Sequence, residues 1–223
     1  MKSVIITGGG SGLGAALAEE YAKKYKVILI GRTLNKLTLV KELVMQRGQQ
    51  ADCYACDVTS MEEVKRVFGQ LFQQEDIHML INNAGSGIFG PLEKFTEEDV
   101  NLLLDTNVKG TIYTTMTALP YLKDKAQGQI MNIISTAGLR GKVNESVYCA
   151  SKFAVRGFTE SLVKELDGTG ISVTAVYMGG MDTPFWNDSD HVKDKSRFKT
   201  PEQVAAQIAA EDTGNAGEIF IDR

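Results

Sequence analysis

Tyr148 and Lys152 are the two side chains of this sequence whose types and spacing most directly suggest catalysis. They stand at the ends of the pentapeptide Tyr-Cys-Ala-Ser-Lys, in a segment whose apolar residues recur with the spacing of a helix. Residues four apart share one face of a helix, so the phenol and the ammonium group would lie side by side. A free tyrosine has a pKa of about 10, and a nearby cation lowers it by favouring the phenolate. Taken alone, this spacing also fits a surface pair; with further polar partners, it predicts proton transfer near neutral pH.

Two more polar segments directly follow predicted apolar strands. Ser135 comes after the strand Gln129–Ile134, and the sequence Asn-Asn-Ala-Gly at Asn82–Gly85 follows the strand His78–Ile81. Ligand-binding groups of a parallel sheet gather at the carboxyl ends of its strands. We therefore expect both segments to contribute to one site with Tyr148.

A glycine-rich turn follows the first predicted strand and precedes a helix. It reads Thr-Gly-Gly-Gly-Ser-Gly-Leu-Gly over Thr7–Gly14. Glycines let the backbone approach phosphates closely, and a helix N-terminus offers unpaired N–H groups and a positive dipole end. At the first crossing of an α/β chain, this arrangement predicts a pyrophosphate site for a dinucleotide. The spacing is T-G-x-x-x-G-x-G rather than G-x-G-x-x-G.

The end of the second strand indicates which dinucleotide is bound. An NAD-selective site usually has an acidic residue there, which holds the hydroxyls of the adenosine ribose. This sequence has Gly31 instead, followed by Arg32 and Thr33. A guanidinium can bind a 2′-phosphate with two hydrogen bonds, and Lys36 adds a second cation one helical turn later. We expect NADP(H) rather than NAD(H); the alternative is that Arg32 is an ordinary surface arginine.

Strand-like and helix-like segments alternate along most of the chain. The strands are predicted at Ser3–Ile6, Lys26–Ile30, Ala51–Cys56, His78–Ile81, Gln129–Ile134, Ile171–Tyr177 and Glu218–Ile221. The helices are predicted at Gly12–Lys24, Asn35–Arg47, Ser60–Gln74, Thr96–Leu119, Ser146–Leu166 and Pro201–Ala210. This alternation indicates βαβ units and a parallel sheet covered on both faces. We expect a single doubly wound, Rossmann-type α/β domain over residues 1–223, with a parallel sheet of about seven strands. Residues 181–199 fit neither element and are either a solvated loop or a substrate loop.

The composition is that of an ordinary globular protein. The 223 residues include 24 Lys and Arg against 28 Asp and Glu, which gives a net charge of −4. This charge argues against a binder of nucleic acid or of anionic membranes, which would need a positive excess. Because no apolar stretch approaches the ~20 residues of a membrane span and no secretory signal is seen, we expect a cytoplasmic protein.

The cysteines and histidines indicate neither disulfides nor a metal site. Cys53 and Cys56 have the spacing of a redox pair, but they lie in a predicted strand, where residues three apart point to opposite faces. An odd cysteine count fits a reducing compartment. Nothing near His78 or His191 has metal-ligand spacing, so no metal is expected.

Taken together, these motifs resemble those of the short-chain dehydrogenase/reductase family. The resemblance covers nearly the whole chain: the glycine turn Thr7–Gly14, Asp57 and Val58 after the third strand, Asn82–Gly85, Asn107 in the next helix, Ser135, and Tyr148–Lys152. It implies an NADP(H)-dependent oxidoreductase that transfers hydride between nicotinamide and a carbonyl or alcohol substrate. A reductase of carrier-bound 3-oxoacyl substrates and a non-catalytic NADP-binding regulator are the alternatives.

The resemblance also implies residue roles. Tyr148 would be the general acid/base, Ser135 would polarise the substrate oxygen, and Lys152 would lower the pKa of Tyr148 and bind the nicotinamide ribose. Asn107 would hold a water that links Lys152 to solvent. The implied cofactor-binding residues are Thr7, Gly8, Gly10, Ser11, Gly12, Leu13, Gly14, Arg32, Thr33, Asp57, Val58, Asn83, Ala84, Gly85, Tyr148, Lys152, Gly179 and Thr183.

Two features concern the end of the chain and its assembly. Met178 stands where the family commonly has proline, so the turn before Thr183 lacks a rigid residue. Relatives in the family pair through the helices that correspond to Thr96–Leu119 and Ser146–Leu166, and both carry apolar residues beyond one core-facing stripe. A homodimer is therefore expected. The sequence ends two residues after the last predicted strand, which argues against a second interface and a tetramer.

Overall fold

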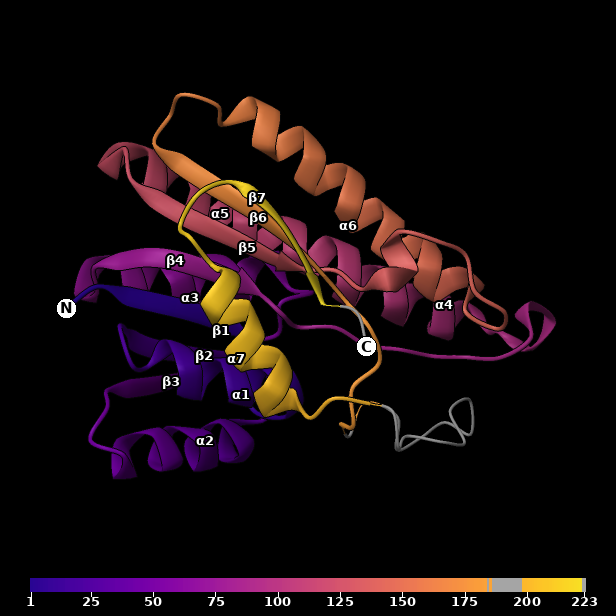
Figure 1. Ribbon diagram of the computed structural model, residues 1–223, viewed down its shortest axis with the longest axis horizontal. Coiled ribbons are helices and arrows are strands. Elements are labelled where there is room, and N and C mark those ends of the chain that lie inside the picture. The colour runs from indigo at the N-terminus through magenta and orange to yellow at the C-terminus, as the bar shows by residue number, and fades with distance from the viewer. Residues whose placement is uncertain (184, 186–197, 222–223) are drawn as a thin grey trace.

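Seven parallel strands form the centre of the computed structural model, which describes residues 1–183, 185 and 198–221 (Figure 1). Within those residues the strands are β1 Ser3–Thr7, β2 Lys26–Gly31, β3 Ala51–Ala55, β4 Ile77–Asn82, β5 Gly128–Ile133, β6 Ile171–Met178 and β7 Gly217–Ile221. They lie in the order β3-β2-β1-β4-β5-β6-β7. The predicted parallel sheet and its seven strands are confirmed.

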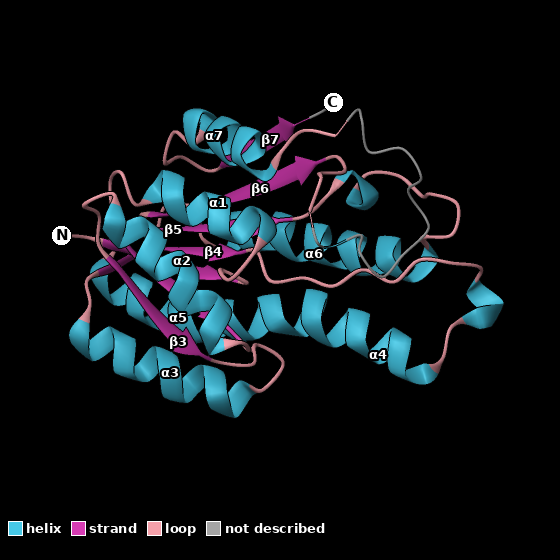
Figure 2. Ribbon diagram, turned by 90° about the horizontal axis from the view of Figure 1, so that it is seen from below, coloured by secondary structure: helices cyan, strands magenta, loops and turns pink. Residues whose placement is uncertain are grey.

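Helices cover both faces of this sheet (Figure 2). They are α1 Gly12–Tyr21, α2 Leu34–Gln46, α3 Met61–Gln74, α4 Glu97–Leu104, α5 Gly110–Lys125, α6 Ser146–Glu165 and α7 Pro201–Glu211. α1, α2 and α7 pack on one face, around a core that includes Leu17 and Ile208. α3, α5 and α6 pack on the other face, where Phe68 and Leu162 are buried. The predicted α/β fold, wound on both sides of the sheet, is confirmed.

The predicted helix Thr96–Leu119 is a run of three parts rather than one α-helix. α4 is followed by a π-helical turn at Asp105–Lys109 and then by α5, which continues through Pro120. The predicted end before Pro120 is therefore wrong. A proline inside a helix leaves the carbonyl four residues earlier without its helical hydrogen bond, and here that residue is Met116, which is 55% exposed. The π turn contains Asn107, and such turns are frequent at functional sites.

A buried network of amide and hydroxyl groups joins the central strands to the helices behind them. Asn82 on β4 lies opposite Asn132 on β5, and its Nδ2 atom donates to Oδ1 of Asn132 at 2.9 Å. Thr114 of α5 donates to Oδ1 of Asn82 at 2.6 Å, and Thr115 accepts from its Nδ2 at 2.9 Å. Asn132 donates in turn to Thr159 of α6 at 2.8 Å. All five residues are buried, so these bonds hold both helices to the strands without help from water.

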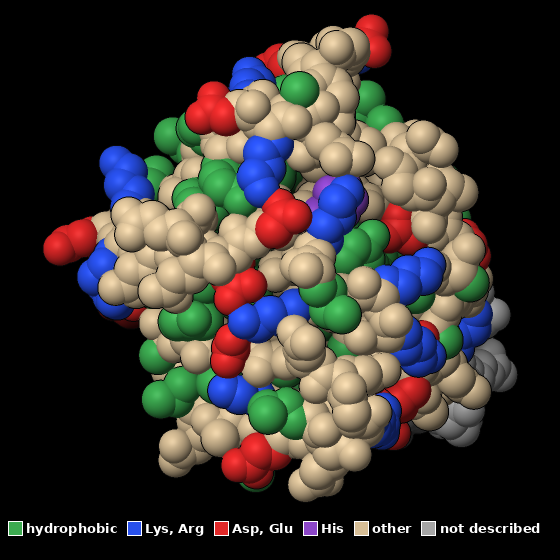
Figure 3. All heavy atoms as spheres, turned by 90° about the vertical axis from the view of Figure 1, so that its left-hand side faces the viewer, with side chains coloured by type: hydrophobic (Ala, Val, Ile, Leu, Met, Phe, Trp, Pro, Cys, Tyr) green, Lys and Arg blue, Asp and Glu red, His purple; other side chains and the backbone are tan. Residues whose placement is uncertain are grey.

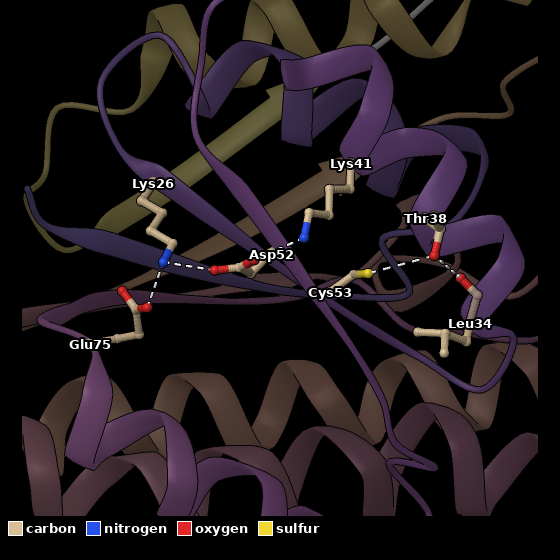
Figure 4. A network of polar contacts seen from close by, with 7 residues as sticks. All are labelled: Lys26, Leu34, Thr38, Lys41, Asp52, Cys53 and Glu75. Carbon is tan, nitrogen blue, oxygen red and sulfur yellow. Dashed lines mark hydrogen bonds and ion pairs between the residues drawn. The ribbon is translucent and has the colours of Figure 1, made fainter. Parts of the chain in front are cut away.

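Charged side chains brace the outer strands at the far end of the sheet (Figure 4). Lys26 at the start of β2 forms ion pairs with Asp52 at 2.7 Å and with Glu75 at 2.6 Å. Lys41 of α2 contacts Asp52 at 3.0 Å. A single pair of this exposure contributes little, but the network joins β2, β3, α2 and the end of α3.

Cys53 and Cys56 lie on opposite faces of the sheet, as predicted. The sulfur of Cys53 lies 3.8 Å from the hydroxyl of Thr38 on α2 (Figure 4). Cys56 is buried in the core of the other face, and this burial raises the pKa of its thiol to about 11. All three cysteines are free thiols.

Acidic and basic side chains are interspersed on the face that carries the amino ends of the strands (Figure 3). Neither sign of charge forms a continuous field there, in keeping with the nearly balanced composition. Among the helices of the described residues, none has the length and apolar character needed to cross a membrane.

Gly14 provides a test of how tightly α1 packs on the glycine turn. A Cβ atom at Gly14 would lie 2.1 Å from the carbonyl oxygen of Gly8, a backbone atom that cannot turn aside. Gly14→Ala should therefore lower the free energy of unfolding by about 1–3 kcal/mol. Gly69 lies inside α3 with nothing within 4 Å of an added Cβ, so Gly69→Ala should raise it by about 0.5–1 kcal/mol. Urea unfolding measures both variants, and equal effects would contradict this packing.

Candidate active site

A cavity of about 730 Å³ opens at the carboxyl ends of the central strands. Its walls include the glycine turn after β1, the segments after β2, β4 and β5, and the first turns of α6. The cavity includes the segments after β1 and β4, the neighbouring strands at which the order of the sheet reverses. Doubly wound sheets bind ligands at this position.

Most of the predicted site residues line this cavity. They are Gly8, Gly10, Ser11, Gly12, Leu13, Gly14, Arg32, Thr33, Asp57, Val58, Asn83, Ala84, Gly85, Ser135, Tyr148, Lys152, Gly179 and Thr183. Thr7 and Asn107 are buried and do not line it. Within the predicted loop 181–199, residues 181, 183, 185, 198 and 199 line the cavity, whereas 184 and 186–197 lie outside the described residues.

Thr7 supports the cavity from behind by joining β1 to the segment after β4. Its hydroxyl oxygen accepts the N–H groups of Asn83 and Ala84, both at 3.0 Å. The side-chain nitrogen of Asn83 donates to the carbonyl of Thr7 at 2.9 Å and to that of Gly8 at 3.3 Å. The amide of Asn83 therefore holds the glycine turn in place, in addition to lining the cavity.

The glycine turn leaves the N-terminus of α1 open toward a ligand. Gly8 and Gly12 have φ angles of 67° and 52°, which residues with side chains rarely adopt. Ser11 at the N-cap makes no side-chain hydrogen bond to the helix. Uncapped N–H groups at a helix N-terminus are well suited to a phosphate. Arg32 and Lys36 line the same cavity after β2 and supply positive charge.

Ser135, Tyr148 and Lys152 meet in the same cavity, and all three are buried. Ser135 follows β5 with φ at 152°, a conformation rare for a residue with a side chain, and its hydroxyl accepts the N–H of Ala137 at 3.2 Å. On α6, the Lys152 ammonium lies 5.8 Å from the centre of the Tyr148 ring. It donates to the carbonyl of Ile133 at 3.2 Å. The predicted proximity of phenol, hydroxyl and ammonium is therefore present.

Burial dominates the electrostatics of this group. It raises the pKa of Tyr148 well above the ordinary value, although a hydrogen bond with Ser135 acts in the opposite direction. Burial also lowers the pKa of Lys152 to about 8. The net shift of the Tyr148 pKa in this structure is upward, with burial as its largest cause, and the expected lowering of that pKa by Lys152 stays a prediction.

Asn107 joins the segment after β4 to α6. Its Oδ1 atom accepts the N–H of Ser86 at 2.8 Å, and its Nδ2 atom donates to the carbonyl of Ser86 and to the hydroxyl of Ser151, both at 3.0 Å. Ser151 donates onward to the carbonyl of Tyr148 at 2.7 Å. The side chain of Asn107 thus positions two segments of the site, and its water-holding role stays a prediction.

Sequence reasoning missed several cavity residues that have no motif of their own. They include Thr106, Thr136 and Glu145. Thr106 and Thr136 could have been found because they stand next to Asn107 and Ser135 in the sequence. Glu145 gave no signal, because its burial at 6% exposure depends on the fold. In the part of the chain that is described, no cluster of three or more His, Cys, Asp or Glu side chains could hold a metal ion.

The buried Lys152 should make stability rise with pH. Lysine has a pKa of 10.5 in the unfolded chain against about 8 here, so the unfolded state binds more protons between these values. Lys152→Met removes the buried charge and should raise the free energy of unfolding at pH 7 by roughly 3 kcal/mol, a gain that shrinks toward pH 10.5. Lys164→Met, at an exposed position of the same helix, is the control. Urea unfolding at several pH values checks this, and a gain independent of pH would contradict it.

Comparison with known proteins agrees with this geometry. Residues 2–194 match the family model for short chain dehydrogenases. An uncharacterized oxidoreductase of Staphylococcus saprophyticus is 35% identical over 198 residues, or 85% of this chain and 82% of that protein. The sepiapterin reductase of Chlorobaculum tepidum is 31% identical over 218 residues, or 93% and 89%. Among solved structures, a variant of actinorhodin polyketide ketoreductase with NADPH has a TM-score of 0.90 at 27% identity, covering 99% of this chain and 95% of that one. The chain belongs to the short-chain dehydrogenase family and is an oxidoreductase.

Proposed function

We propose that this protein transfers hydride between NADP(H) and a carbonyl or alcohol substrate, with Tyr148 as the general acid/base. The observation that carries the proposal is the meeting of Ser135, Tyr148 and Lys152 in the cavity that also contains the glycine turn and Arg32. Two similar proteins support the proposal, because one is named a sepiapterin reductase and the other a ketoreductase that was solved with NADPH. The three free thiols fit the cytoplasmic location that we propose with it.

The residues of the cavity fit the cofactor. Uncapped amides of α1 would hold the pyrophosphate, and Arg32 with Lys36 would hold a 2′-phosphate. Asp57 and Val58 would line the adenine side, and Gly179 and Thr183 the nicotinamide side. When bound, the cofactor supplies the hydride.

The protein supplies the proton and the polarising group. Because burial raises the pKa of Tyr148, its phenol stays protonated at neutral pH, which is the form that donates to a carbonyl oxygen. Ser135 would donate a hydrogen bond to the same oxygen and stabilise the charge that develops there. Lys152, with a pKa of about 8, can release and regain a proton near neutral pH and can thus restore the phenol.

We also propose a homodimer formed through α4, α5 and α6. Exposed apolar side chains on these helices include Leu102, Met116 and Phe153, which are 40%, 55% and 43% exposed. Light scattering at micromolar concentration should give twice the chain mass. Met116→Lys combined with Phe153→Lys should give monomers, whereas Leu39→Lys on α2, where Leu39 is 62% exposed, should leave the dimer intact. A monomer mass for the unaltered protein would refute the proposal.

Arg32 should determine the choice of cofactor. We expect NADPH to bind at least tenfold more tightly than NADH, a difference of ~1.4 kcal/mol. Arg32→Ala should weaken NADPH far more than NADH, because it removes a partner of the 2′-phosphate only. Arg47→Ala, an exposed arginine at the end of α2, is the matched control. Calorimetric titration measures all these affinities, and equal affinities for the two cofactors would disprove the assignment.

Tyr148→Phe tests the chemistry itself. The variant loses one oxygen, so its fold and NADPH affinity should be nearly intact, while turnover should fall by ~10²–10⁴-fold. Tyr54→Phe on β3, outside the cavity, should keep full turnover. The substrate for this test comes from a screen of NADPH oxidation with aldehydes, ketones, quinones and 3-oxoacyl thioesters.

The outcomes of that screen separate the alternatives. Selective turnover of 3-oxoacyl thioesters would favour the carrier-bound substrate, and tight NADPH binding without any turnover would favour a regulator. If Tyr148→Phe reduced a confirmed substrate at the wild-type rate, the proton would come from another group.

A further inference from the structure

Two phenyl rings pack against the ring of Tyr148. Phe185, which lines the cavity, has its ring centre 5.9 Å from that of Tyr148, with the planes tilted by 59°. Phe89, from the segment after β4, lies 5.4 Å from Tyr148 at 71° and 5.9 Å from Phe185 at 61°. These are the separations and tilts at which aromatic rings attract one another edge to face. The three residues, Tyr148, Phe89 and Phe185, are called the aromatic wall below.

The backbone gives this wall a flat base. A Cβ atom on Gly87 would lie 2.3 Å from Cζ of Phe185 and 2.7 Å from Cζ of Phe89. Both phenyl rings therefore rest against a position where no side chain fits. Ile88, Phe95 and Val147 pack around the same cluster and extend its apolar surface.

The segment that carries Phe89 is held at both ends. Ser86 is bonded to Asn107 through its N–H and its carbonyl, at 2.8 and 3.0 Å. Gly90 donates its N–H to the carbonyl of Asn144 at 2.8 Å. Phe89 is thus held in place against Tyr148 and Phe185, and it positions the ring of Phe185 that lines the cavity.

Charged side chains also belong to the lining of the cavity. Arg32 and Lys36 follow β2, on the other side of β1 from the catalytic strands. Lys142 and Glu145, which follow β5, form an ion pair with each other at 3.8 Å, and Lys199 donates to Oε1 of Gln207 at 3.0 Å. Arg140 lines the cavity as well. Phe185, 5.9 Å from Tyr148, gives the substituent on a carbonyl held at Ser135 and Tyr148 a phenyl ring to pack against. Hydroxyl or charged groups packed against that ring would gain no hydrogen bond from it, at a cost.

We infer, on the basis of the proposed function, that the substrate is a carbonyl compound attached to an aromatic or similarly flat conjugated ring. Aryl aldehydes, aryl ketones and quinones belong to this class; polyhydroxylated sugars and short hydroxy acids do not. Phe185 determines this specificity by offering its ring to the ring of the substrate, and Phe89 positions Phe185 through the contact between their rings.

Matched pairs of carbonyl compounds test this inference. Reduction by NADPH is followed for acetophenone against cyclohexyl methyl ketone, and for benzaldehyde against cyclohexanecarboxaldehyde, so that each pair shares one carbon skeleton. The ratio of kcat/KM within a pair is then compared between wild type and variants, which cancels the intrinsic reactivity of the two carbonyls. Phe185→Leu should lower the preference for the aromatic member by about two- to tenfold, the worth of one aromatic contact. Phe89→Leu should act in the same direction.

Two variants serve as controls. Phe72→Leu makes the same change at a ring that stacks on Tyr121 outside the cavity, at 4.4 Å, and should leave the ratio unchanged. Phe185→Tyr keeps the ring and should keep the preference, which separates loss of the ring from disturbance of the segment. NADPH affinity, measured by calorimetry, should be the same in Phe185→Leu and wild type.

Three results would overturn the inference. An unchanged ratio in both Phe185→Leu and Phe89→Leu would show that the wall does not select the ring. A preference of more than tenfold for 3-oxoacyl thioesters or for sugar ketones over every aryl substrate would assign the site to that class while leaving the oxidoreductase in place. Tight NADPH binding with no reduction of any carbonyl would instead remove the proposed function, and the inference with it.

Discussion

The hydrogen bond between Asn82 and Asn132 is the interaction on which the arrangement of the site depends. The two amides lie opposite each other on β4 and β5, buried in the middle of the sheet, and each also bonds a helix. A buried amide without a partner costs about 1–3 kcal/mol, so these groups strongly disfavour any packing that separates them. Sliding β5 by one residue would turn Asn132 to the opposite face and leave both amides without this bond. The pairing therefore selects one register of the central strands and one placement of α5 and α6.

The register of these strands also determines where the residues of the site lie. Asn83 directly follows Asn82, and its amide ties the glycine turn to β4. On the helical side, Asn107 in the π turn before α5 reaches Ser86 and Ser151. Hydrogen bonds therefore lead from the end of β4 to the glycine turn by one route, and from the segment after β4 to α6 by the other. The glycine turn and α6, which both line the cavity, are thus tied to the same part of the sheet.

The parts of the fold that could be predicted from the sequence are those with a local cause. Strands such as Lys26–Gly31 contain a continuous apolar run, and the turn Thr7–Gly14 is recognised by its five glycines. The opposite faces of Cys53 and Cys56 follow from the period of a strand alone. Asn132, in contrast, lay inside what looked like an apolar strand, and its partners are set by tertiary packing. The π turn and the passage of α5 through Pro120 also depend on neighbours far along the chain. The raised pKa of Tyr148 could not be predicted either, because the spacing of Tyr148 and Lys152 indicates a nearby cation but not the burial of the phenol.

The burial of Lys152, which the sequence could not reveal, lowers the stability of the fold and at the same time places a charged group in the cavity. Lys152 is held in the interior with its ammonium bonded to the carbonyl of Ile133, and its lowered pKa means that the folded state carries this charge at a cost near neutral pH. Lys26, far from the site, carries no such net cost: burial acts to lower its pKa, but the hydrogen bonds to Asp52 and Glu75 raise it above the usual value. A ligand with hydroxyl oxygens near this ammonium and negative charge near the N-terminus of α1 would offset part of this cost. The buried groups that carry the cost would then also be the ones that bind the ligand, as expected where polar groups are preorganised for a partner.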